Sequence, residues 1–143
     1  MQSPQARGDK RKRKVIYITA RAHAGETHSS VVMQKLIHEL CLSTKANDKS
    51  KYEALFQAYV VKLVPMINVD GVVIGNARTS LIGLDLNRRW TQPNPLVHPE
   101  VYFLKKEMLK AQKAYDGIQI FCDLHGHNKN PNAFVYGCHK AAN

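Results

Sequence analysis

The fold of this 143-residue chain is set by the stretch VIYITARAHAGET, residues 15–27. Its first part, from about Val15 to Arg21, has the length and the β-branched content of a buried strand. The apolar residues after it recur at i, i+3, i+4 and i+7, which predicts an amphipathic helix over about 28–42. His23 and Glu26 therefore lie on a strand-to-helix turn, where side chains converge beyond a sheet edge. Either they are a solvated surface pair, or they bind one zinc ion and leave positions for a third ligand and water.

Further strands and helices are expected to alternate along the chain. The pattern predicts strands at about 58–64, 118–124 and 133–136, and helices at about 52–57 and 99–115. Residues 66–95 have little periodicity but many Gly, Asn and Pro residues, and a loop of this length is usually functional. The alternation predicts an α/β fold with a mixed, largely parallel sheet and crossover helices.

The charge is concentrated at the N-terminus. The net charge is +10, and residues 1–14 carry six Lys or Arg against Asp9 alone. We interpret residues 1–14 as a basic disordered tail, either solvated or in contact with an acidic polypeptide, with nucleic acid or with a targeting receptor. No recognisable nucleic-acid motif accompanies the charge, which argues against a nucleic-acid module.

The sequence favours an intracellular protein. No apolar run approaches the roughly 18 residues that span a bilayer, and the N-terminus lacks the apolar core of a signal peptide. Three widely spaced cysteines argue against a disulfide framework and fit a reducing, cytoplasmic location. Cys41 and Cys122 lie in apolar runs and are expected in the core.

His125 is the candidate third ligand, because it ends the 118–124 strand as His23 ends the first strand. Two histidines and one carboxylate make the ligand set of a catalytic zinc, which keeps one coordination position open. His127 and His139 are competing ligands at this stage.

The long loop holds four polar residues that suit such a site. Asp85 is a candidate acceptor for the outer N–H of a zinc-bound imidazole. Arg78 and Arg88 can bind a carboxylate or polarise a carbonyl, and Asn87 can donate to the same group. The alternative is that residues 85–88 form a polar turn in which Asp and Arg pair locally.

Five blocks in order carry a family resemblance: RAHAGET (21–27), PMINVDGV (65–72), GNAR (75–78), GLDLNRRW (83–90) and DLHGH (123–127). Together they resemble the zinc metallocarboxypeptidases, and within them the cytosolic carboxypeptidases that trim glutamates from tubulin and other protein tails. The glycines at positions 25 and 126 resemble those of the cytosolic branch, whereas digestive-type enzymes usually have Arg and Ser at these positions. Val69 departs from the family, which usually has Pro after Asn68.

The resemblance implies a role for each site residue. His23, Glu26 and His125 would bind one Zn²⁺ per domain, and Asp85 would orient His23. Arg78 would polarise the scissile carbonyl, while Asn87 and Arg88 would hold the C-terminal carboxylate of the substrate. The implied partners are acidic, glutamate-rich protein tails such as those of tubulin, with no membrane involved.

The family's general-base Glu lies on a strand well downstream of the third ligand. The acidic residues after Asp85 are Glu100, Glu107, Asp116 and Asp123, and none lies downstream of His125, where that base would be. We therefore expect residues 15–143 to be the N-terminal part of a zinc carboxypeptidase catalytic domain, truncated and inactive alone. The alternatives are an amidohydrolase of acylated amino acids with the same zinc site, and a non-catalytic fragment that binds zinc or acidic tails.

Overall fold

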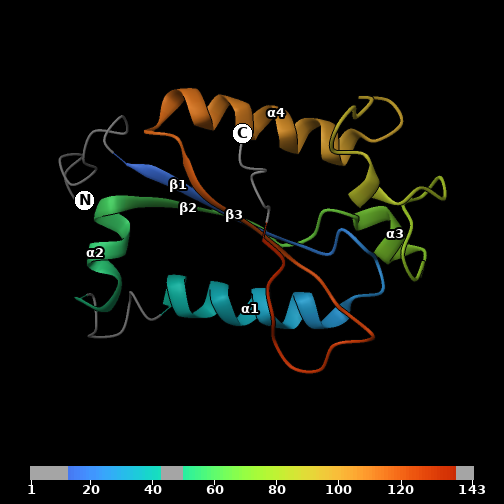
Figure 1. Ribbon diagram of the computed structural model, residues 1–143, viewed down its shortest axis with the longest axis horizontal. Coiled ribbons are helices and arrows are strands. Elements are labelled where there is room, and N and C mark those ends of the chain that lie inside the picture. Colours follow the sequence, from blue (N-terminus) through green and yellow to red (C-terminus); the bar gives the residue numbers. More distant parts are fainter. Residues whose placement is uncertain (1–12, 43–49, 138–143) are drawn as a thin grey trace, which may run out of the picture.

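Residues 13–42 and 50–137 are described by the structure, a computed structural model. Three parallel strands form one sheet in the order β2-β1-β3. They are β1 (Lys14–Ala20), β2 (Tyr59–Val64) and β3 (Ile118–Leu124), so the predicted parallel α/β sheet is confirmed. The main helices are α1 (Thr27–Leu42) and α4 (Pro99–Ala114), which lie on opposite sides of the sheet (Figure 1).

Three shorter helices complete the described chain. α2 (Ser50–Ala58) leads into β2. The long loop after β2 contains α3 (Val69–Val73) and the short 3₁₀ helix η3 (Leu86–Arg88). Asn68 caps α3, since its Oδ1 accepts the Gly71 N–H at 3.0 Å, and its Nδ2 donates to the Ala22 and Thr79 carbonyls. This buried amide ties the loop to the end of β1.

The core lies mainly between the sheet and α4. Val101, Leu104, Met108 and Ala111 follow one another at three- and four-residue spacings, so they form one stripe on α4. They pack against residues of the sheet and the loops in two adjoining clusters. The sheet partners include Val15, Tyr17, Val60, Val64 and Ile118, and the loop partners include Ile67, Leu86 and Trp90.

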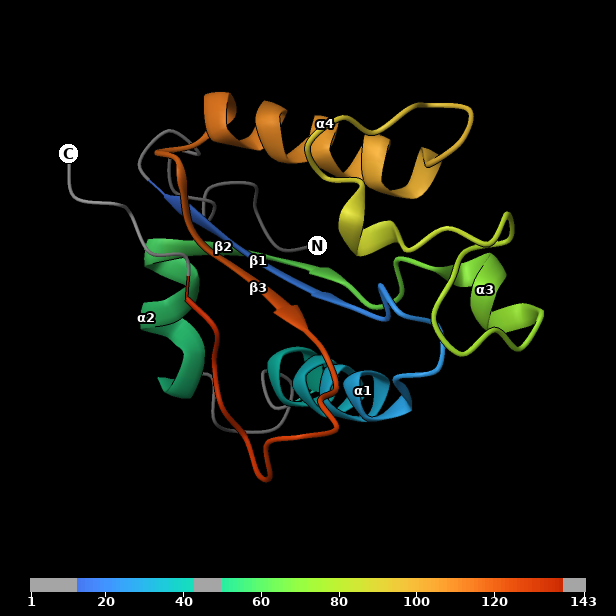
Figure 2. The same cartoon turned by 45° about the vertical axis from the view of Figure 1, so that its right-hand side comes forward.

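The topology brings the carboxyl ends of β1 and β3 side by side. The chain leaves β1 through α1 to reach β2 on one side, and returns through α4 to β3 on the other side (Figure 2). Ligand sites in open α/β sheets lie where strand order reverses in this way. His23 follows β1 and His125 follows β3, so both lie at this edge of the sheet.

Two structural predictions are wrong. Residues 133–136 form no strand, because no strand among the described residues pairs with them, and Val135 is 91% exposed. Phe134 instead packs its ring edge-on against His127, with centroids 5.1 Å apart. Cys41 and Cys122 are exposed rather than buried.

Some predictions fall outside the described residues: most of the basic tail, the polar loop at 43–49, and His139. Lys14, placed in that tail, is the first residue of β1. Within the described chain, no helix has the length and apolar content needed to cross a membrane.

Candidate metal centre

The turn between β1 and α1 is held by hydrogen bonds to the Ser29 hydroxyl and to the Ala77 carbonyl. Arg21 has a φ of 56°, in the left-handed region that few residues other than glycine adopt. Its N–H donates to Ser29 Oγ at 3.3 Å, and the same hydroxyl donates to the Glu26 carbonyl at 2.7 Å. The Gly25 N–H donates to the Ala77 carbonyl at 2.7 Å, and a Cβ at Gly25 would lie 2.6 Å from that oxygen. The turn therefore requires glycine at this position.

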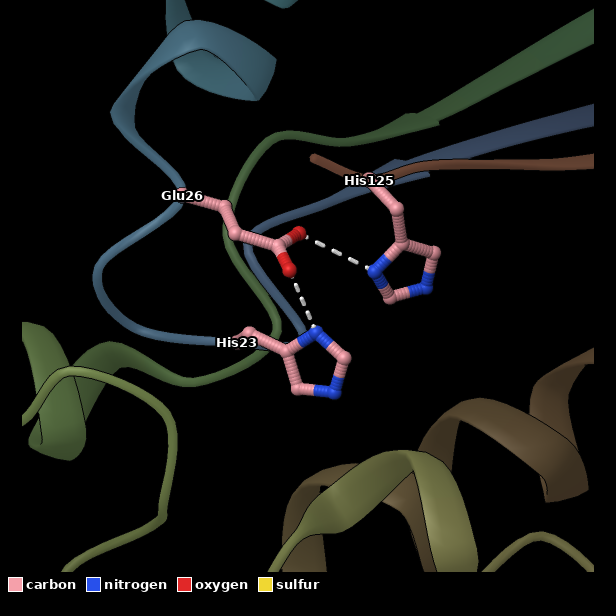
Figure 3. A group of neighbouring side chains, drawn as sticks. All are labelled: His23, Glu26 and His125. Carbon is pink, nitrogen blue, oxygen red and sulfur yellow. Dashed lines mark hydrogen bonds and ion pairs between the residues drawn. The ribbon is translucent and has the colours of Figure 1, made fainter. Parts of the chain in front are cut away.

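His23, Glu26 and His125 converge on one point (Figure 3). Nδ1 of His23 lies 2.7 Å from Oε1 of Glu26, and Nδ1 of His125 lies 3.1 Å from Oε2. The two imidazole centroids are 4.7 Å apart, and one candidate ligand atom from each of the three residues fits within a 4.8 Å separation. Their assignment as zinc ligands remains a prediction, and this arrangement is the one it requires.

Each imidazole lies between two carboxylates. Nε2 of His23 is 3.2 Å from Oδ1 of Asp85, and Nε2 of His125 is 2.7 Å from Oδ2 of Asp123. A neutral imidazole has only one N–H, so its other nitrogen turns a lone pair towards an anionic oxygen. The conflict disappears if the ring gains a proton or if a cation lies between Nδ1 and Glu26. This donor set, with two imidazole nitrogens and one carboxylate aimed inward, fits Zn²⁺.

The charges at the centre are consistent with a cation site. The hydrogen bond to Asp123 raises the pKa of His125, burial opposes the change, and Glu26 adds to it. Burial by itself would raise the pKa of Glu26, but the Gly126 N–H and His23 outweigh it, and the pKa is lowered. Without a metal, the acidic groups stay ionised and attract a proton to His125.

Asp85 is fixed by two groups of its own loop. Nε and Nη2 of Arg78 donate to its Oδ2 at 2.9 and 2.8 Å, and the Asn87 N–H donates to Oδ1 at 2.9 Å. Burial favours a higher pKa for Asp85, but Arg78 and the Asn87 N–H outweigh it and lower the pKa. The ionised carboxylate caps η3 and faces His23 at the same time.

Glu26 is held by the backbone that follows β3. The Gly126 N–H donates to its Oε2 at 2.8 Å. A Cβ added at Gly126 would lie 2.3 Å from Cε1 of the His28 ring, so a close approach explains glycine here too. The carboxylate is thus positioned by the residue that follows His125.

The predicted substrate-binding residues lie on the long loop, and Asn87 contacts the centre. Nδ2 of Asn87 is 3.4 Å from Nε2 of His125, and the Trp90 indole N–H donates to Asn87 Oδ1 at 3.1 Å. Arg88 ends η3 and is exposed, and the side chain of Arg78 is half-exposed. The local pairing considered for residues 85–88 does occur for Asp85, but with Arg78 rather than Arg88.

His127 does not join the centre. Its Nδ1 accepts the backbone N–H groups of Lys129 and Asn130 at 3.1 and 3.0 Å, and its Nε2 lies 3.4 Å from the Tyr136 hydroxyl. The His127 ring therefore makes its hydrogen bonds within its own loop.

Sequence reasoning gave no role at the site to Asp123 or Thr19. The Thr19 hydroxyl donates to Oδ1 of Asp123 at 2.6 Å. A signal for Asp123 was present, because residues two apart on a strand project to the same face. No sequence pattern around Thr19 indicates a role at the site.

The zinc carboxypeptidase family matches residues 2–129. The chain belongs to this family. Cytosolic carboxypeptidase 1 of Danio rerio is 43% identical over 128 residues, which cover 90% of this chain and 11% of the relative. Cytosolic carboxypeptidase 6 of Caenorhabditis elegans is 39% identical over 126 residues, which cover 87% of this chain and 26% of the relative. The chain belongs to the cytosolic carboxypeptidase branch, as the five blocks predicted, and spans a small part of these relatives.

Solved structures agree with this assignment. A metallo-carboxypeptidase from Pseudomonas aeruginosa superposes with a TM-score of 0.70 at 31% identity. One from Burkholderia cenocepacia gives a TM-score of 0.72 at 28% identity. Each match covers 88% of this chain and 30% of the solved chain.

Proposed function

We propose that this chain is the metal-binding part of a zinc-dependent carboxypeptidase. The enzyme would remove C-terminal residues, above all glutamates, from acidic protein tails such as those of tubulin in the cytoplasm. The proposal rests on the geometry of the two imidazoles. The Nδ1 atoms of His23 and His125 both point at the Glu26 carboxylate, and each Nε2 faces an aspartate. A zinc ion held there would supply the Lewis acid for peptide hydrolysis.

The residues of the centre have separable tasks. His23, Glu26 and His125 hold the metal, and Asp85 keeps the proton of His23 on Nε2, so that Nδ1 stays free to bind. Burial of His23, which is 5% exposed, limits the rotation of its ring. This half of the site is therefore preorganised before the metal arrives.

Substrate would be held by the loop between α3 and α4. Arg78 uses Nε and Nη2 on Asp85, which leaves its Nη1 N–H groups available to polarise the scissile carbonyl. Asn87 lies beside His125, and exposed Arg88 is the next residue, so both can hold a terminal carboxylate close to the metal. An acidic tail would complement these guanidinium groups.

Proton transfer needs a further group. Among the described residues after Asp85 the carboxylates are Glu100 and Glu107 on α4, the exposed Asp116 just before β3, and Asp123. Asp123 is occupied by His125 and Thr19, and Glu107 is paired with Lys110. We propose that the general base of the complete enzyme comes from outside this chain.

The test is a chimera in which this chain replaces the matching segment of the zebrafish cytosolic carboxypeptidase 1. The zinc-loaded, monodisperse chimera is assayed on peptides ending in glutamate and on acylated amino acids, with a His125→Ala chimera as the matched control. Chelator-sensitive release of glutamate, absent in the control, is expected. Hydrolysis of acylated amino acids instead would identify an amidohydrolase, and zinc binding without either reaction would identify a non-catalytic protein.

A further inference from the structure

We propose that Asp123 is a positioning residue that holds the Nε2–H of His125, so that Nδ1 faces the metal, and that Thr19 holds Asp123 in place. This inference rests on the zinc centre proposed above. It adds to Asp85 a second carboxylate–imidazole pair, built from a different part of the chain.

The contacts form a chain from the buried core to the metal centre. Thr19 is fully buried on β1, and its hydroxyl donates to Oδ1 of Asp123 at 2.6 Å. The other oxygen, Oδ2, lies 2.7 Å from Nε2 of His125. Thr19 and Asp123 are direct partners in the register of β1 and β3. The two oxygens of one carboxylate therefore have separate tasks, one towards the core and one towards the imidazole.

The proton of His125 is assigned by competition at Nε2. Asn87 Nδ2, a donor, lies 3.4 Å away and would need a lone pair on Nε2. Asp123 Oδ2, an acceptor, lies at 2.7 Å and needs an N–H there. The contact to the carboxylate is shorter and charge-assisted, and such hydrogen bonds are about twice as strong as neutral ones. In the metal-bound centre Nε2 would therefore carry the proton, and the lone pair of Nδ1 would be left for the ion.

His125 needs this support more than His23 does. Its strand is at the edge of the described sheet, and neighbouring side chains on β3 such as Ile120 and Phe121 are 48% and 42% exposed. A ring on an open strand can rotate or change tautomer unless a hydrogen bond fixes it. Thr19 is on the central strand, and its hydroxyl holds Asp123, which in turn holds the His125 ring.

The experiment measures zinc dissociation constants by chelator competition on the whole 143-residue chain. Asp123→Asn, which keeps the shape but removes the charge, is expected to weaken zinc binding about 10–100-fold. Thr19→Val is expected to weaken it about 2–10-fold, the range for loss of one hydrogen bond. Asp116→Asn is the matched control: its exposed side chain precedes β3, and the same charge change should leave the constant unaltered.

A second readout separates positioning from a purely structural role. ¹⁵N-labelled, zinc-loaded chain reports the tautomer of His125 by NMR, with the proton on Nε2 in the wild type. In Asp123→Asn that N–H should exchange faster with solvent. Unchanged affinity and unchanged exchange in Asp123→Asn would overturn the inference alone. If Asp123→Asn does not fold, Thr19→Val decides by the same two measurements. Absence of zinc binding by the wild-type chain would overturn the proposed centre itself.

Discussion

His23 and His125 occupy equivalent positions beyond β1 and β3, but the structures that support them differ. His23 follows the central strand, lies in the core, and faces an aspartate fixed by Arg78 and a backbone N–H. The side chain of His125 is 27% exposed, follows an edge strand, and faces an aspartate fixed by one threonine. The same carboxylate–imidazole pair thus has buried, rigid support at His23 and more exposed support at His125. Rigidity in this centre comes from the neighbours of each ligand rather than from the ligand type.

The difference extends to the two glycines beside the ligands. Gly25, in the His23 half, is packed against the backbone carbonyl of Ala77. Gly126, in the His125 half, is packed against the ring of His28, an exposed side chain that can move. Backbone contacts resist substitution more than contacts with a mobile side chain do. The His125 half should therefore tolerate changes that the His23 half does not.

The largest expected effect concerns catalysis, because we propose that the general base belongs to neither half. The zinc-loaded 143-residue chain should release glutamate from peptides about 10²–10⁴-fold more slowly than the full-length zebrafish relative, as expected for loss of a general acid–base. The measurement is a chelator-controlled assay on a monodisperse sample. A rate comparable to that of the relative would mean that one of the two halves contains a base, and His127→Ala would be tested first.

The next effect tests the rigid half directly. Asp85→Ala should weaken zinc binding about 10–100-fold, because His23 loses the acceptor that fixes its tautomer. The measurement is chelator competition, with Asp116→Ala as the control because its exposed carboxylate precedes β3. A folded Asp85→Ala chain with wild-type affinity would refute the role of Asp85 and remove the basis for comparing the two pairs.

The glycines give a smaller contrast. Gly25→Ala should lower the free energy of unfolding by about 1–3 kcal/mol, since the added methyl overlaps a backbone oxygen and forces the turn to shift. Gly126→Ala should cost less than about 1 kcal/mol, because His28 can rotate away. Urea unfolding of the two variants measures both values. Equal losses would show that the two halves are equally constrained.

The smallest effect is expected on the exposed surface of β3. Ile120→Thr should change the free energy of unfolding by no more than about 0.5–1 kcal/mol, because the side chain is half-exposed and both residues are β-branched. It should also reduce self-association, which exposed apolar edge strands promote. Urea unfolding and light scattering check the two outcomes. A loss above about 2 kcal/mol would show that β3 is better buried in solution than its exposure indicates.

The sequence by itself determined the elements whose signals are local. The three strands and the helices α1 and α4 agree with their predicted positions to within one residue at every end, because side-chain periodicity and flanking Gly or Pro residues act over short distances. The ligand candidates were also visible, since a histidine at a strand end and a His-x-x-Glu turn are short patterns. The family and its cytosolic branch followed from five such blocks.

Tertiary structure alone decided which groups meet. Thr19 and Asp123 are 104 residues apart, and only the pairing of β1 with β3 brings them together. Arg78 rather than Arg88 pairs with Asp85, because the loop folds back on itself after α3. The segment 133–136 has the composition of a strand, but a strand exists only where a partner offers its backbone, and no described strand does so. Composition and spacing describe one segment at a time, whereas hydrogen bonds and burial depend on what lies beside it.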